Sequence, residues 1–327
     1  MMLTTDEGAI ARSVIYASLF DYPLTLEQLH QTLLQSSASP AEVLAVYDSS
    51  ETLPLIVEHR EGFFFPVGRG DLVSERRRRE ALSRTFLERH RRLLAAFCAV
   101  PFTRMIALSG SIAHMNLEDG GDLDLFIITR GRHVWSVTVA VLVIAKLWGR
   151  RDITCANFVI ADSHLTLEQQ DLFTANQTIH LKPLIGRDLL ARFVAANPFV
   201  AQHYPNYRTA DAAAPILVER RALLRVKRAI EWVLQVPALA AEAICRVAYG
   251  WHLRRRARSW RSPGQVRLGR DYLKLHTQSH RQSVTERFES AVADALEALD
   301  RRRRETIPTA VGTRRRGSFP QPARRGG

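Results

Sequence analysis

The chain has 327 residues, 46% of them hydrophobic, and a formal net charge of +13. This length allows one large domain or two to three smaller ones, and the apolar content suffices for real cores. From Trp251 to the end, 19 Lys and Arg stand against 7 Asp and Glu, so nearly all the excess positive charge belongs to the C-terminal quarter. The rest of the chain is close to neutral, and its charge therefore does not indicate a nucleic-acid-binding surface.

The cysteines and the N-terminus indicate the compartment. Cys98, Cys155 and Cys245 are scattered along the chain, which favours reduced, buried thiols over a disulfide framework or a metal site. Residues 1–8 contain two acids and no apolar core, so we expect no signal peptide. These features predict a cytoplasmic protein.

Residues 1–70 are predicted to form a small separate module. We expect helices over Ala9–Leu19, from Leu24 with Thr25 as N-cap, and from Pro40, followed by a hairpin of Leu53–Val57 and Gly62–Val67. Three helices and a hairpin resemble a winged helix in order and size. The third helix carries Glu42 and no Lys or Arg, which favours a packing or interaction role over DNA binding.

A long Arg-rich helix is predicted over Leu72–Val100, and two strands follow it. The strands cover Met105–Leu108 and Leu123–Thr129, both apolar and β-prone. Ser109, Gly110 and Ser111 lie where the first strand ends, and Asp122 and Asp124 lie two residues apart at the start of the second. Two carboxylates at this spacing point to one face of a strand, where they can share divalent ions. A Gly-Ser turn can hold phosphate oxygens through backbone N–H groups and a hydroxyl.

This Gly-Ser and Asp-x-Asp pattern resembles the nucleotidyltransferase superfamily related to DNA polymerase β. The resemblance implies an α+β fold with a mixed sheet flanked by helices. It also implies that Asp122 and Asp124 are catalytic residues and ligands of Mg²⁺ or Mn²⁺, and that Ser109, Gly110 and Ser111 bind a nucleoside triphosphate. The residue before the first acid, often Ser in the superfamily, is here Gly121.

The superfamily usually carries a third carboxylate on the next strand, which we predict over Ile153–Ala161. No acid lies inside this segment; Asn157 is at its middle and Asp152 at its start. Either Asp152 supplies the missing charge, or the site uses two carboxylates, or catalysis has been lost.

The remaining elements are mainly predicted helices. Val134–Leu147 is apolar but too short to span a membrane, so we expect a buried helix packed on the sheet. Ile230–Tyr249 is broken by Pro237 and charged residues, so there we expect two amphipathic helices rather than a membrane span. The other predicted elements are helices over Leu165–Ala175 and Arg187–Ala196, with a short strand or connector at Ile179–Leu184.

We therefore predict four parts. They are a winged-helix-like module (1–70), a nucleotidyltransferase-like core (71–210), a helical C-terminal region (211–304) and a disordered basic tail (305–327) that could contact nucleic acid weakly. The leading hypothesis is metal-dependent transfer of a nucleoside monophosphate from an NTP to an unknown acceptor hydroxyl, with release of pyrophosphate. The alternative is a catalytically weak or inactive nucleotide-binding or interaction protein on the same fold.

Overall fold

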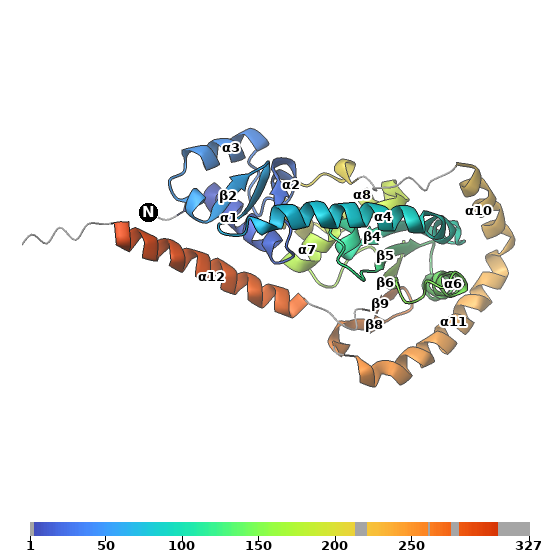
Figure 1. Ribbon diagram of the computed structural model, residues 1–327. Helices are drawn as coiled ribbons and strands as arrows, with labels where there is room; N and C mark the ends of the chain where they lie inside the picture. The colour runs from blue at the N-terminus through green and yellow to red at the C-terminus, as the bar shows by residue number, and fades with distance from the viewer. Residues whose placement is uncertain (1–2, 213–220, 261, 276–280, 307–327) are drawn as a thin grey trace, which may run out of the picture.

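The structure is a computed structural model that describes residues 3–212, 221–260, 262–275 and 281–306. Its centre is a six-stranded mixed sheet in the order β7-β4-β5-β6-β9-β8 (Figure 1). The parallel pair is β5 and β6, and the other neighbours run antiparallel. The strands are β4 (Thr103–Ser109), β5 (Leu123–Thr129), β6 (Thr154–Ala161), β7 (Lys182–Ile185), β8 (Val266–Leu268) and β9 (Tyr272–Leu275).

Helices cover both faces of this sheet, as the alternation of its strand residues requires. One face of β5 buries Leu125 and Ile127 against α4, α6 and α11. The opposite face buries Phe126 and Ile128 against α7, α8 and α9. The helices are α4 (Asp71–Ala99), α6 (Val134–Leu147), α7 (Leu172–Ile179), α8 (Arg187–Ala195), α9 (Phe199–His203) and α11 (Gln235–Arg256). The predicted mixed α+β class, with a mixed sheet flanked by helices, is confirmed.

The predicted helix over Leu165–Ala175 is wrong in its first half. The segment expected as a helix over Leu165–Ala175 is non-helical up to Asp171, which caps α7 by accepting from the backbone N–H of Thr174 at 2.9 Å. Asn197 explains the difference, because its side chain bonds the N–H of Leu167 and the C=O of Leu165, both at 2.8 Å. These backbone groups are therefore satisfied without a helix.

The C-terminal region is not only helical. Its strands β8 and β9 extend the sheet, since Leu273 of β9 pairs with Val159 of β6. The pairing is tertiary, between segments far apart in the chain, and local pattern does not reveal it. The predicted tail begins with the last residues of α12 (Arg281–Thr306), and its remainder, 307–327, lies outside the described residues.

The apolar region around Pro237 forms two helices, α10 (Arg221–Val233) and α11, which are separated at Leu234. Across the described parts of the chain, none of the helices has the length and apolarity needed to cross a membrane.

The N-terminal part has the predicted three helices and hairpin, with a short third strand. Its sheet is antiparallel in the order β1-β3-β2. Thr25 caps the second helix as predicted, and Ser39 caps the third. Of the first predicted strand only Val57 is in the hairpin, because residues 53–55 form a 3₁₀ turn. The elements are α1 (Thr5–Ser18), β1 (Leu24–Thr25), α2 (Leu26–Gln31), α3 (Pro40–Ser49), β2 (Val57–Arg60) and β3 (Phe63–Pro66).

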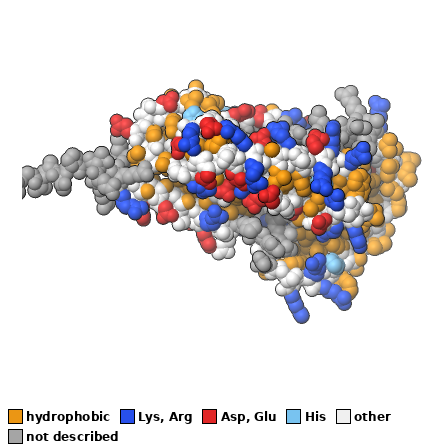
Figure 2. Space-filling model, in the orientation of Figure 1, with side chains coloured by type: hydrophobic (Ala, Val, Ile, Leu, Met, Phe, Trp, Pro, Cys, Tyr) orange, Lys and Arg blue, Asp and Glu red, His pale blue; other side chains and the backbone are white. Residues whose placement is uncertain are grey.

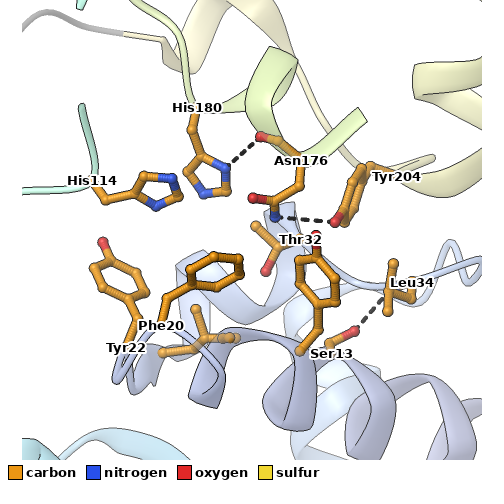
Figure 3. Close-up of a pocket in the computed structure, with 12 residues that line it drawn as sticks. Ser13, Phe20, Tyr22, Thr32, Leu34, His114, Asn176, His180 and Tyr204 are labelled. Atoms are coloured by element: carbon orange, nitrogen blue, oxygen red, sulfur yellow. Dashed lines mark hydrogen bonds between the residues drawn. The ribbon is translucent and has the colours of Figure 1, made fainter. Parts of the chain in front are cut away.

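This N-terminal part packs on the core around a small cavity of about 30 Å³ (Figure 3). The core contributes His114 and His180, whose rings stack with centroids 3.8 Å apart. Tyr22 meets the ring of His114 edge-on. Burial lowers the pKa of both histidines, to about 4 for His180, and the neighbouring cations Arg76 and Lys182 lower both further.

Acidification should therefore weaken this contact. The folded protein holds both rings neutral, so between the ordinary histidine pKa of 6.5 and about 4 the unfolded chain binds protons that the folded chain does not. This contribution to the unfolding free energy is fully present above pH 6.5 and is lost as the pH falls, by roughly 1–2 kcal/mol for His180 at about pH 5, and His114 acts in the same direction. We expect His114→Phe, which keeps an aromatic ring in the stack, to reduce the drop in melting temperature between about pH 7 and about pH 5.

The exposed His252, changed to Phe, is the matched control and should leave that drop unchanged. An equal drop in the native protein and in His114→Phe would show that the stacked pair does not couple pH to stability.

Candidate functional site

The end of β4 and the start of β5 bring the predicted site residues together. In this antiparallel pair, Ser109 lies directly opposite Asp124. Gly110 follows with a φ of 62°, in the left-handed region that favours glycine, and begins the short helix α5 (Gly110–Ala113). A Cβ on Gly110 would lie 2.3 Å from the Oδ2 of Asp124, so only glycine lets the turn approach the carboxylate this closely.

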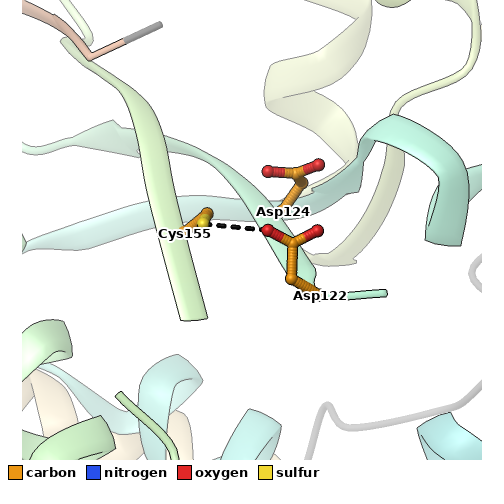
Figure 4. Close-up of side chains that lie close together, drawn as sticks. All are labelled: Asp122, Asp124 and Cys155. Atoms are coloured by element: carbon orange, nitrogen blue, oxygen red, sulfur yellow. Dashed lines mark hydrogen bonds between the residues drawn. The ribbon is translucent and has the colours of Figure 1, made fainter. Parts of the chain in front are cut away.

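The two acids share one face of the sheet with two polar side chains of β6. Cys155 donates from its Sγ to the Oδ2 of Asp122 at 3.0 Å, and Figure 4 shows this bond beside the second carboxylate. Asn157 donates from its Nδ2 to the Oδ1 of Asp124 at 2.7 Å. Ligand atoms of Asp122, Asp124 and Cys155 lie within 4.8 Å of one another. The predicted convergence of the two carboxylates is therefore present.

An irregularity in β6 places Asn157 at this site. Asp124 pairs with Cys155, but Phe126 pairs with Phe158, so β6 has one residue more than β5 over this stretch. Such a bulge re-aims the side chains around it. Asn157 and Phe158 consequently both line the cavity beside Asp124, although neighbours on a regular strand point to opposite faces.

Burial and charge set the protonation of the cluster. Burial first, and the nearby Asp122 second, raise the pKa of Asp124 to about 7, while the bond from Asn157 opposes the shift. Burial also raises the pKa of the Cys155 thiol, and its bond to Asp122 raises it further. Cys155 is therefore a neutral thiol donor at neutral pH rather than a thiolate ligand.

The donor set fits a hard divalent cation. Asp122 and Asp124 could hold such a cation, because carboxylate oxygens are the ligands that Mg²⁺ and Mn²⁺ prefer. A cation between Asp122 and Asp124 would relieve the repulsion that raises the pKa of Asp124.

A cavity of about 300 Å³ opens beside this cluster. Its wall includes Ser109, Gly110, Ser111 and Asp124, so the predicted phosphate-binding turn and one of the acids face the same space. Asp152 does not take part, because it is exposed in the turn before β6 and lies outside the acidic group.

Sequence reasoning missed Lys274. This residue of β9 pairs with Phe158 in register, is 8% exposed and lines the same cavity. It donates to the Oε1 of Gln169 at 2.5 Å, and burial lowers its pKa to about 8. The local signal was a lysine set between Leu273 and Leu275 in a short β-prone run, but only the pairing of β9 with β6 shows where it points.

Comparisons of this chain with protein-family models, curated proteins and solved structures found no match.

The close approach of Gly110 to Asp124 gives a direct test. Gly120 has a φ of 80° and nothing within 4 Å of an added Cβ, so Gly120→Ala carries only the positive-φ cost, about 1 kcal/mol. Gly110→Ala adds the displacement of Asp124, and we expect a total loss of roughly 2–4 kcal/mol of unfolding free energy. Urea denaturation of both variants measures the difference. Equal losses would mean that the turn does not press on the carboxylate.

Proposed function

We propose that the chain is a metal-dependent nucleotidyltransferase, which moves a nucleoside monophosphate from an NTP to an acceptor hydroxyl and releases pyrophosphate. The observation that carries this proposal is the juxtaposition of the Gly110–Ser111 turn with Asp124, beside Asp122, at the edge of a cavity. Together with the likeness of the motif to the superfamily related to DNA polymerase β, it supports that assignment for the core. The winged-helix assignment of residues 1–70 belongs to the same proposal.

The cavity offers complementary charges to a triphosphate. Asp122 and Asp124 would hold the Mg²⁺. A bound Mg²⁺ would neutralise negative charge on the phosphates, on the attacking oxygen of the acceptor and on the leaving oxygen of pyrophosphate. Ser111 and the backbone N–H groups after Gly110 would bind phosphate oxygens. Lys274 of β9 lines the same cavity as the Gly110–Ser111 turn, and its ammonium group would bind a phosphate or the leaving pyrophosphate. The ring of Phe158 lies beside Lys274 and offers a surface for stacking.

The protein's own groups would position the reaction. Asn157 holds the Oδ1 of Asp124 and so fixes the orientation of that carboxylate. Cys155 does the same for Asp122. Fixed ligands cost little reorganisation when charge develops on the phosphate, which is how a site of this kind accelerates phosphoryl transfer.

Nucleotide binding should depend on the two acids. We expect Asp122→Asn and Asp124→Asn each to weaken Mg²⁺-dependent NTP binding at least about tenfold, because a ligand loses its charge. Calorimetry with a panel of NTPs, with and without Mg²⁺, measures this. Without metal the melting temperature should hold or rise, since the substitutions relieve the repulsion between the two carboxylates.

Asp119→Asn is the control, because Asp119 belongs to the same loop but is exposed and pairs with Arg78 at 3.1 Å. It should bind NTP as the native protein does. If metal-dependent affinity survives in both site variants, the acids are not ligands and the proposal fails.

A second function, nucleotide binding without turnover, rests on Asn157. In the position beside Asp124 where the superfamily usually has a third carboxylate, this chain has an amide that donates a hydrogen bond to Asp124. An amide cannot take a proton from an acceptor hydroxyl. The exposed position of Asp152 favours this alternative further.

Asn157→Asp separates the two functions. The substitution supplies a third carboxylate, which could bind a second cation and activate a hydroxyl. If the native protein only binds nucleotide, we expect the variant to gain Mg²⁺-dependent pyrophosphate release. If the native protein is active, that activity is present already and is lost on Asp124→Asn.

Gln177→Glu is the control, because it makes the same amide-to-carboxylate change in the wall of the same cavity, on helix α7 rather than on the strands of the acidic cluster. It should not create activity. Silence of both the native protein and Asn157→Asp, with nucleotide still bound, would eliminate transfer chemistry and leave the binding function.

A further inference from the structure

Helices α10 and α11 carry an apolar surface that none of the residues described in the structure covers (Figure 2). The exposed fraction is 77% for Trp232, 79% for Val236 and 53% for Trp251. The surface formed by these three residues with Leu239, Ile244 and Val247 is called the α10–α11 face below. Monomeric proteins seldom expose a contiguous apolar area of this kind without a partner for it.

Two buried acids determine which side of these helices turns outward. Glu231, 2% exposed, accepts from the backbone N–H of Phe102 at 2.7 Å. Glu242 accepts from the N–H groups of Trp135 and Ser136, at 3.0 and 2.7 Å, at the start of α6. Each carboxylate thereby satisfies backbone donors of the core, and the helix faces opposite to them must point to solvent.

These are also the only acids in residues 221–260, a range that contains nine Lys and Arg. Lys227 points inward and donates to the C=O of Thr103 at 2.7 Å. Exposed arginines lie on the same sides of the helices, since Arg228 precedes Trp232 by four residues and Arg254 follows Val247 by seven. The guanidinium of Arg255 lies 3.5 Å from the ring centroid of Trp251. The outward side is therefore apolar and cationic, with no exposed acid over 225–260.

We infer that the α10–α11 face binds an anionic lipid surface, with the two helices lying in the plane of the interface. Exposed tryptophans and aliphatic side chains flanked by arginines are the composition of interfacial helices, and arginines add attraction to anionic headgroups. A second copy of this chain fits less well, because docking the same face on itself sets arginine against arginine with no acid to pair them. This inference does not depend on the proposed nucleotidyl transfer.

The test is flotation of the full chain with vesicles. We expect the protein to float with vesicles of phosphatidylcholine mixed with phosphatidylglycerol, and far less with phosphatidylcholine alone. Added salt should weaken the binding. Trp232→Glu and Val236→Glu should each lower the bound fraction about tenfold, because a charge would enter the apolar layer.

Val67→Glu is the matched control, since Val67 is an exposed valine of the N-terminal part, 39% exposed. It should float as the native protein does. Arg254→Gln and Arg255→Gln change exposed side chains of the last turn of α11 on the α10–α11 face, so they keep the test decisive if a Glu variant unfolds. We expect each to weaken binding to the anionic vesicles about fivefold.

Three results would overturn the inference. The first is a native protein that floats with neither kind of vesicle. The second is that folded Trp232→Glu and Val236→Glu float as well as the native protein. The third is a dimer, seen by light scattering without lipid and dissociated by Trp232→Glu, which would assign the face to self-association.

Discussion

The pairing of β4 with β5 is the constraint on which the site depends. It sets Ser109 opposite Asp124 and leaves room at residue 110 for a hydrogen atom only. The loop that joins the strands is similarly tight, because a Cβ on Gly121 would lie 2.3 Å from the Cδ1 of Leu117. That contact gives a local reason for glycine immediately before Asp122, where the superfamily it resembles often has serine.

The cavity has acidic side chains on one side and a lysine on the other. The two acids lie at the start of β5, and Lys274 lies on the far side of β6, with the ring of Phe158 beside it. Burial pushes the pKa of Asp124 upward and that of Lys274 downward, so each group is less strongly charged than it would be in water. A ligand that carries both a cation and phosphates would compensate both ends at once.

The sequence predicted the local elements of the core well, because their signals are local. β5 and α6 have the predicted bounds, since an unbroken apolar run between polar turns leaves little choice of start and end. The two acids and the Gly-Ser turn could be predicted to converge because adjacent strands bring their connected ends together. Asn157 was identified from the sequence as the polar residue at the middle of β6.

What the sequence did not reveal comes from distant pairing. The bulge in β6 is set by its register with β5, and Lys274 reaches the cavity because β9 pairs with the far edge of β6. The helix expected from Leu165 gives way to a backbone held by Asn197, a residue far enough away that no window of sequence joins them. The inward acids of α10 and α11 looked like ordinary charged interruptions of an apolar region.

The late arrival of β9 has a consequence for synthesis. Chains emerge from the ribosome N-terminal end first, so β6 is complete before residues 272–275 exist to pair with it. During that interval β6 is an edge strand, and its Phe158-Val159-Ile160 segment is an apolar template with free N–H and C=O groups on one side. The nascent chain thus passes through a state prone to intermolecular pairing, which ends when β9 covers the edge and brings Lys274 to the cavity.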